Sequence, residues 1–452
     1  MKKKYFMGLM STMILISSQA GLSGRQAHAG QYLNKHLPKW LEMDLQLRHR
    51  YEWMSDFDFN KNVDDNKGFS LWRARLALGL KPNDMFKLFY QLQDARISND
   101  SVSGSKAAYE NWGETRQLWA EVNLNKLPLD KVGLTNIGVR FGRQEFSYGA
   151  QRLLGAFDWS NVSQTFDAGK VMLDFGDKSF KVDIFGGGKK PVKSPREMDD
   201  FYDGSSNDVI GGYYAAYSKD KNFLFEQYLI RRDTDGKKVS FGQTGDGAVE
   251  DYTIGGRMKG KFGSSSWDYE LEAAKQFGNS GRLDVDAQMA VGIIGYTFPV
   301  GWKPRASFEF DYASGDNDSS DGDRETFDNL HPTNHLFYGY MDFVSLQNIN
   351  NYHFQLAAYP HKGIELQMDY HLIYLDTPKD NLYSAGRTIK RATVAGADSY
   401  VGGELDLLTK FKATDFCGML VGYSHFFAGQ FLSDTGISED ADYFYVQTTL
   451  NF

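Results

Sequence analysis

The sequence has little of what stabilises small secreted proteins or anchors a chain in a membrane by helices. A single cysteine, Cys417, stands among 452 residues, so no intrachain disulfide can form. No apolar run after residue 16 approaches the ~20 residues that a membrane-spanning helix requires. The formal net charge of −8 argues against nucleic acid as a partner. We therefore expect neither a disulfide-stapled module nor a helical anchor.

The local motifs of catalysis are also missing. The chain contains no G-x-S-x-G, no H-E-x-x-H and no phosphate-binding loop. His371 shares a predicted strand face with Asp369, but a hydrogen-bonded histidine facing water is the simpler interpretation. The histidines weighed in this way are His331, His335, His353, His371 and His425. We expect no enzymatic activity and no cofactor, with a barrel-borne hydrolase as the alternative from another class.

The first 29 residues read as an export signal. Residues 2–4 are lysines, residues 6–16 are mostly apolar, and Ala27-His28-Ala29 has the small residues of a cleavage site. Cleavage after Ala20 competes with cleavage after Ala29. We expect residues 1–29 to be removed and residues 30–452 to form one domain.

What the chain does contain is strict alternation of apolar and polar residues. In the last ten residues, Phe444, Val446, Leu450 and Phe452 alternate with Tyr445, Gln447, Thr449 and Asn451. Residues 41–53 alternate in the same way. Successive side chains of a strand point to opposite faces, so each stretch predicts one apolar and one polar face. The edge strand of a soluble β-sandwich is the alternative for the last stretch alone.

Connection lengths decide between these alternatives. Short turns at 81–84, 176–179, 219–222, 263–266, 299–303, 360–363 and 412–415 alternate with long polar connections. The alternation fits an all-β fold, a transmembrane antiparallel β-barrel of about 18 strands with short periplasmic turns and long extracellular loops. The connections at 125–135 and 279–283 fit it less well. We predict that 443–452 pairs with 41–53 and closes a barrel in the outer membrane of a Gram-negative bacterium.

The predicted inward faces carry charge of both signs. Basic residues dominate the early strands and acids the late strands, so the two sets are expected on opposite walls of a water-filled lumen. The basic candidates are Arg48, Arg50, Arg73, Arg75, Arg140, Lys170, Arg257 and Arg305, and the acidic wall includes Glu121, Glu309, Asp311, Glu365 and Asp369. They either select solutes, as charged rings do in channels, or merely pair across a wet wall.

One stretch, RFGRQE followed by YGAQRLLGAFDWSN at 140–161, resembles the alginate-export family of outer-membrane barrels. TRQLW (115–119), DYTIGGRMKGKFG (251–263), FDNLHPTNHLFYGYMDFVSLQN (327–348) and VGGELDLLTKF (401–411) extend the resemblance. It implies an 18-stranded barrel whose arginine-lined constriction selects an acidic polysaccharide. Arg116, Arg140 and Arg143 stand at positions similar to the family's basic pore residues, and Arg152 lies in the same stretch. A bulge at Gly142 would turn Arg143 inward.

The sequence departs from the family at two places. Gln117 stands where the alginate exporter has a glutamate, and the final strand lacks an arginine found there. We therefore expect a pore for hydrophilic, anionic solutes or an alginate-like glycan, with a general diffusion porin as the alternative. The expected partners are outer-membrane lipid and the barrel-assembly machinery, which would engage the strand ending at Phe452.

The acidic segment 314–325 is a weak calcium candidate. Its carboxylates could hold Ca²⁺, although the spacing does not match an EF-hand loop, and a solvated loop tip is the competing interpretation. The residues concerned are Asp316, Asp318, Asp321 and Asp323.

Overall fold

A computed structural model describes residues 31–63, 65–99, 106–124, 133–192, 196, 208–234 and 247–452. The predicted signal peptide, residues 1–29, lies outside these ranges. None of the helices in the described part of the chain is long and apolar enough to cross a membrane.

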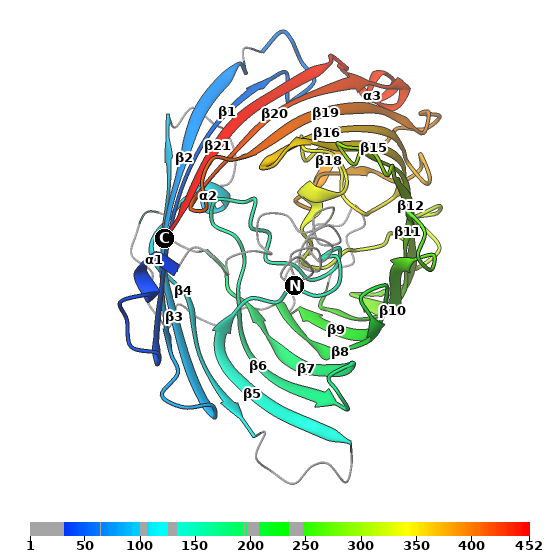
Figure 1. The fold of residues 1–452 in the computed structure, drawn as a ribbon. Helices are drawn as coiled ribbons and strands as arrows, with labels where there is room; N and C mark the ends of the chain where they lie inside the picture. The colour runs from blue at the N-terminus through cyan, green and yellow to red at the C-terminus, as the bar shows by residue number, and fades with distance from the viewer. Residues whose placement is uncertain are drawn as a thin grey trace.

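The described residues form one sheet of 19 strands, of which 18 make a closed antiparallel ring (Figure 1). The remaining strand, β14 (Asp323–Arg324), lies parallel to β12 inside a loop. This confirms the predicted barrel. The ring strands are β1 (Leu41–Ser55), β2 (Lys67–Leu80), β3 (Phe86–Ser98), β4 (Asn111–Asn123), β5 (Leu134–Gln144), β6 (Phe166–Phe175), β7 (Phe180–Lys189), β8 (Asp208–Asp220), β9 (Phe223–Thr234), β10 (Val249–Lys261), β11 (Trp267–Ser280), β12 (Leu283–Thr297), β13 (Arg305–Ala313), β15 (Ile349–His361), β16 (Ile364–Tyr374), β19 (Tyr400–Lys412), β20 (Cys417–Ala428) and β21 (Ala441–Asn451).

Several short elements are not strands of the ring. They are α1 (Gln31–Asn34), α2 (Lys106–Tyr109), η3 (Asn334–Leu336), the hairpin of β17 (Leu382–Tyr383) with β18 (Ile389–Arg391), and α3 (Gln430–Thr435).

The first and last strands close the ring, as predicted. Their register runs from Gln46 opposite Asn451 to Ser55 opposite Asp442. The main chains of Leu45 and Phe452 exchange two hydrogen bonds at the end of this seam, of 2.8 and 3.2 Å. In lipid an unpaired strand edge would leave backbone groups unsatisfied, so this seam is what allows the sheet to span a membrane.

The two faces of the ring are assigned as the alternation predicts. Large apolar side chains remain exposed on the outside, and Leu356, Met368 and Leu407 form one row across β15, β16 and β19, each more than 40% exposed. Inside, polar and charged side chains such as Arg48 and Glu52 are buried. The segment 222–232, which is apolar on both faces, points Glu226 and Arg232 inward and Phe225 outward.

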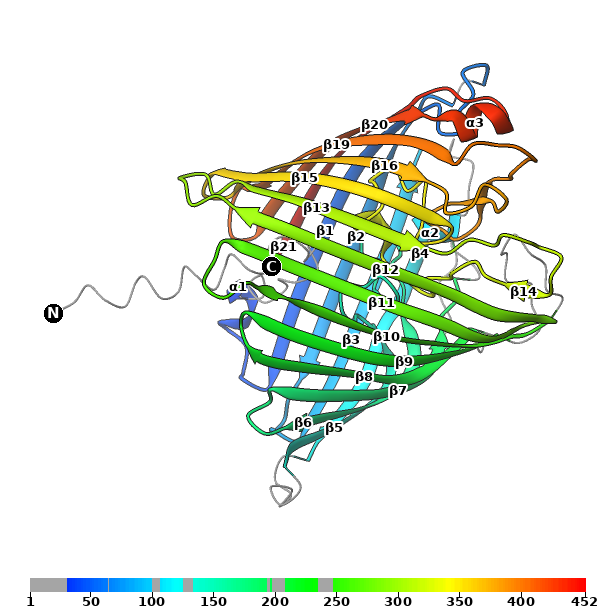
Figure 2. The ribbon, with the colours of Figure 1, turned by 90° about the vertical axis from the view of Figure 1, so that its right-hand side faces the viewer.

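Long loops gather at one end of the barrel and short turns at the other (Figure 2). The long end carries β14, β17, β18 and α3. The β11–β12 connection is an exception at the long-loop end, since it consists of only two residues, Gly281 and Arg282. Most of the 125–135 connection lies outside the described residues. Since long loops face outward in barrels of this kind, the long-loop end is extracellular.

The face assignment predicts a large difference between two adjacent substitutions on β16. Met368→Arg places a cation in the lipid-facing row, which costs roughly 2–4 kcal/mol near the midplane. Gln367→Arg places the same cation inside, beside Glu365 and Asp369. Heat-modifiable gel mobility after refolding should show a clear loss of folded protein for Met368→Arg and little for Gln367→Arg. Equal losses would contradict the face assignment.

Candidate functional site

Two extracellular loops fold into the barrel rather than covering it. They are the β5–β6 loop, residues 145–165, and the later part of the β13–β15 loop, residues 326–348, which lie inside the ring in Figure 1. The earlier part of the β13–β15 loop, with β14, stays at the long-loop end, where residues 317–322 are exposed (Figure 2). Residues 152–156 of the first and 326–335 of the second are buried throughout. The lumen at this level is therefore filled by protein, so any solute path is shaped by these loops.

The two loops are joined to each other. Leu154 and His331 form a parallel bridge, supported by bonds from Gly155 N to His331 O and from His331 N to Leu153 O, both 2.9 Å. The Gln164 amide also donates to His331 O at 2.9 Å. Burial lowers the pKa of His331 to about 4, so its ring is neutral at physiological pH. The loops thus form one unit within the lumen.

The β13–β15 loop is anchored to the wall by its own polar groups. The Arg387 guanidinium lies 2.9 Å from Asp328, and the Gln276 amide donates to the Asp328 main chain at 2.6 Å. Glu404 of β19 accepts a 2.8 Å bond from Met341 N. These contacts hold the loop against β11 and β19.

On one side of the lumen stands a basic wall, formed by Arg48 and Arg50 of β1, Arg73 and Arg75 of β2, and Arg116 of β4. Each of these side chains is at most 5% exposed. The sequence predicted the inward direction of the β1 and β2 arginines. It did not predict that the β5–β6 loop covers them.

The centre of the basic wall is Asp158 of the β5–β6 loop. Its carboxylate lies 2.7 Å from Arg75 and 3.1 Å from Arg73, while its main-chain oxygen accepts from Arg48 at 2.8 Å. The Ser163 hydroxyl accepts from Arg75 at 2.8 Å and donates to the same carboxylate at 3.1 Å. These guanidinium charges hold the pKa of Asp158 well below its usual range. Three cations surround one anion here.

Sequence reasoning missed Asp158, because nothing in a loop sequence shows that it returns into the barrel. The available signal was an acid between two aromatic residues, Phe157 and Trp159, within a connection expected to be solvated.

Arg50 and Arg116 have their own anions. Arg50 lies 2.5 Å from Glu52, and its guanidinium stacks 3.7 Å from the centre of the Trp159 ring. Arg116 pairs with Glu145 and donates to Gln91 at 2.7 Å. Strict alternation places Arg116 outside, but the β3–β4 register shifts after Gln91, and this bulge turns Arg116 inward beside Gln117.

The opposite side is an acidic wall, to which the β5–β6 loop contributes a cation. Arg152, fully buried, lies 2.8 Å from Glu270, 3.3 Å from Glu272 and 2.7 Å from Glu309. These carboxylates hold the pKa of Arg152 well above its usual range. Arg257 shares Glu270 at 2.9 Å. The same loop therefore supplies an acid to the basic wall and a base to the acidic wall.

A histidine pair continues the acidic wall. His353 lies 2.8 Å from Asp369 and 3.4 Å from Glu309, and its ring stacks 4.1 Å from that of His371. Asp311 accepts from the Asn351 amide at 2.9 Å. In this cluster the Ser424 hydroxyl donates to Asp406, not to a histidine nitrogen. The arrangement is not a nucleophile and base pair, which requires the base to contact the nucleophile.

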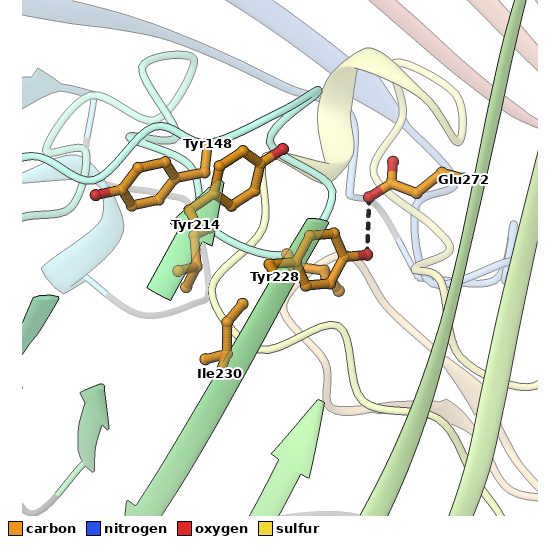
Figure 3. Close-up of a pocket in the computed structure, with 7 residues that line it drawn as sticks. Tyr148, Tyr214, Tyr228, Ile230 and Glu272 are labelled. Atoms are coloured by element: carbon orange, nitrogen blue, oxygen red, sulfur yellow. Dashed lines mark hydrogen bonds between the residues drawn. The ribbon is translucent and has the colours of Figure 1, made fainter. Parts of the chain in front are cut away.

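Three stacked tyrosines, from the β5–β6 loop, β8 and β9, surround a small cavity (Figure 3). Tyr148 of the β5–β6 loop stacks on Tyr214 at 4.8 Å between ring centres, and Tyr214 on Tyr228 at 5.6 Å. The Tyr228 hydroxyl donates to Glu272 at 3.1 Å. Together they enclose a cavity of only about 10 Å³.

Toward the short turns the inward side chains are more exposed and form pairs on neighbouring strands. Each cation there faces an anion, so this part of the wall alternates in charge rather than dividing into two halves. The pairs are Arg140 with Glu121 at 2.5 Å, Lys170 with Asp183 at 3.1 Å, Arg305 with Asp268 at 2.6 Å and Lys410 with Glu365 at 2.7 Å.

Two sequence interpretations are wrong in their geometry. The β4–β5 and β5–β6 ladders have no bulge at Gly142, so Arg143 stands opposite Leu118 and Asp167, on the same parity as Phe141, which is 75% exposed on the outside. Arg143 pairs with Asp167 at 2.8 Å there and is not part of the lumen wall.

The calcium interpretation is the second. Across the described residues no three His, Cys, Asp or Glu side chains are grouped to hold a metal ion. The acidic segment instead caps its own turns, with Asp318 accepting from Ser320 and Asp321 from Asp323 N. Asp316 likewise accepts from Asp318 N at 3.0 Å.

Solved structures with the same fold are outer-membrane channels. OccK11 (OpdR) of Pseudomonas aeruginosa is 12% identical with a TM-score of 0.56, covering 91% of this chain and 96% of that chain. OccAB1 of Acinetobacter baumannii is 10% identical with a TM-score of 0.58, covering 92% of this chain and 97% of that chain. OprD of Pseudomonas aeruginosa is 10% identical with a TM-score of 0.58, covering 91% of this chain and 93% of that chain. At these identities the likeness concerns the fold. The comparison with curated proteins finds no match.

The family comparison covers nearly the whole barrel. The Alginate export family matches residues 39–446, from just before β1 into β21. Family and fold place the protein in the outer membrane of a Gram-negative bacterium, and both are those of channel proteins. The chain belongs to the alginate-export family of outer-membrane β-barrel proteins.

Proposed function

We propose that this outer-membrane pore passes carboxylate-bearing hydrophilic solutes, with a uronate polysaccharide such as alginate as the cargo that family membership suggests. The observation that best supports this proposal is the carboxylate of Asp158, which Arg73 and Arg75 hold in the lumen. Guanidinium forks match carboxylates and stay charged at any working pH, so the site that holds Asp158 suits a uronate equally well.

The arginines of the basic wall have more positive charge and more hydrogen-bond donors than Asp158 uses. Around Asp158, two guanidinium groups contact the carboxylate and a third, that of Arg48, contacts the main-chain oxygen. The buried Nε–H groups of Arg48, Arg73 and Arg116 also have no protein acceptor in the described chain. A buried donor without an acceptor costs free energy, and the oxygens of an anionic solute would supply the missing acceptors. This supports selection by Arg48, Arg73 and Arg75 in particular.

The other candidate residues take different roles in this proposal. Arg50, Arg116, Arg152 and Arg257 each have strong anionic partners and hold the loops or walls in place. Arg140, Lys170 and Arg305 belong to the exposed, charge-alternating wall near the periplasm, which would pass a polyanion without trapping it. Arg143 lies outside the path.

A solute can pass through the lumen only if the β5–β6 loop moves, because this loop covers the arginines of the basic wall. The loop carries three non-glycine residues with left-handed backbone, Gln151, Phe157 and Ser163, at φ of 65°, 49° and 65°. Such residues cost about 1–3 kcal/mol each and persist only where their surroundings enforce them. A solute carboxylate that replaces Asp158 would remove part of that enforcement.

The alternatives are a general diffusion porin and a barrel-borne hydrolase. A diffusion porin needs no convergence of arginines on a carboxylate. A hydrolase needs a nucleophile beside a base, which the histidine cluster does not provide. We further propose that the barrel acts without cofactor and that its β21, ending near Phe452, engages the barrel-assembly machinery.

Replacing Arg73 and Arg75 together by Ser should shift the reversal potential toward cations and weaken block by uronate oligomers. Both effects should be larger at low salt, because salt screens the attraction that brings a dissolved anion toward the lumen. Planar-bilayer recording measures them. Arg231→Ser removes one charge from the outer face and is the control. Unchanged ion preference and block in the double variant would favour the diffusion porin.

Asp158→Asn should act in the opposite direction. The amide keeps the shape of the side chain but not its charge, leaving Arg73 and Arg75 free for a solute. Hydrogen bonds to charged groups contribute about 1.5–3 kcal/mol, and every 1.4 kcal/mol is about tenfold in an equilibrium.

We therefore expect about tenfold or tighter uronate block and stronger anion preference in Asp158→Asn. Asp167→Asn, at an exposed outer carboxylate, is the matched control and should behave as the natural protein. Weaker block in Asp158→Asn would show that the loop acid assists the solute instead of competing with it.

A further inference from the structure

A second cavity lies at the extracellular mouth, apart from the lumen walls. Its volume is about 400 Å³, within the range of ligand-binding pockets. Three loops meet around it, those between β1 and β2, between β16 and β19, and between β20 and β21. The lining residues are Phe57, Asp58, Phe59, Asn60, Lys390, Arg391 and Ile437.

Two cations in this cavity are held by main-chain oxygens instead of carboxylates. The Lys390 ammonium donates to Phe57 O at 2.7 Å, and Arg391 donates to Ile437 O at 2.8 Å and Thr435 O at 3.5 Å. Within the described chain neither forms an ion pair, in contrast to Arg152 and Arg257 in the lumen. Lysine has three donors and arginine five, so both retain donors for a ligand.

Aromatic rings fix the cations and form part of the lining. The Lys390 ammonium lies 4.9 Å from the ring centre of Phe59 and 4.5 Å from that of Phe343. The half-buried Phe57 meets Phe343 edge-on at 4.9 Å. Because Phe343 belongs to the β13–β15 loop, the lining residues Phe57 and Phe59 pack against the unit that fills the lumen.

The β1–β2 loop is held in an unusual backbone shape where it lines the cavity. Asp56 and Phe59 have left-handed φ of 55° and 63°. The Asp65 carboxylate accepts from the main-chain N–H groups of Asp56 and Phe57 at 2.7 and 2.9 Å. Glu439 N donates to Phe59 O at 3.0 Å, which ties this loop to the β20–β21 loop. Non-glycine residues in this conformation cluster at ligand sites, and here the contacts pre-form the cavity.

We propose that this cavity binds a uronate unit of an acidic saccharide at the extracellular mouth, a site that rests on the proposed function and adds to the lumen arginines. Lys390 and Arg391 would take the carboxylate. The Asp58 carboxylate and the Asn60 amide would bond sugar hydroxyls, and the Phe57 ring would lie against the sugar.

Proton linkage supports this assignment. Burial first, and the charge of Arg391 second, lower the pKa of Lys390 to about 8, while the facing carboxylates Asp58 and Asp65 raise it. A bound carboxylate favours the protonated lysine and raises its pKa again. Above this pKa binding therefore takes up a proton, and affinity should fall as pH rises from about 8.

The test is calorimetric titration of the full chain in detergent with a uronate trimer, a neutral glucose trimer and inorganic phosphate. Lys390→Gln combined with Arg391→Gln removes both charges, and Lys390→Arg keeps the charge at every pH. Lys379→Gln, an exposed lysine of the same loop, is the control. Arg73→Ser with Arg75→Ser separates lumen binding from binding in the cavity.

We expect the double glutamine variant to bind the uronate trimer at least about tenfold more weakly at pH 7, with the control unchanged. In the natural protein, binding should weaken between pH 7 and 9, and Lys390→Arg should not show this loss. Unchanged binding in the double variant, or equal binding of phosphate or the neutral trimer, would overturn the proposal.

Failure of the lumen proposal can be distinguished from failure of the cavity proposal. Ion preference in bilayers should be unaltered by the cavity variants and altered by the Arg73 and Arg75 variant. If the lumen arginines prove indifferent while trimer binding still depends on Lys390 and Arg391, the cavity stands as a surface saccharide site.

Discussion

The backbone pairing of β1 with β21 is the constraint on which the rest of the structure depends. A hydrocarbon surrounding offers no partner for an unpaired N–H or C=O, so the sheet must close. Closure decides that one face of the sheet becomes the interior and the other the surface toward lipid. Apolar side chains such as Met368 then face lipid, and charges such as Arg48 and Glu270 must share the interior.

Once charges are gathered inside, their desolvation has to be offset. Burying an ion costs several kcal/mol unless a partner compensates it. The β5–β6 loop does this on both sides at once, with Asp158 between the arginines and Arg152 between the glutamates. The loop is thus complementary in charge to both walls, and the excess of positive charge remains on the side of β1 and β2.

The alternation of residues was sufficient to predict the faces of most strands and the seam, and the connection lengths predicted the end at which the long loops lie. Alternation did not orient the segment 222–232, which is apolar on both faces. A period of two is a strong signal when one face meets lipid. Arg116 escaped it, because the bulge after Gln91 depends on the pairing with a neighbouring strand. Arg143 follows the alternation, and the bulge expected at Gly142 is absent. The loop between 325 and 348 carries five aromatic residues, too many for a solvated loop, and that was the available sign that it folds inward. Contacts such as Asp158 with Arg75 join distant segments and have no local signature.

The joined loops also bear on the order of assembly. The β5–β6 loop touches β1 and β2 through Asp158 and reaches β11 and β13 through Arg152, so it extends across the ring from one wall to the other. A loop that crosses the lumen in this way can enter most easily before β1 and β21 have paired. Insertion of the loop would then precede the zipping of β21 onto β1, and the last step of biogenesis would seal a lumen that is already occupied.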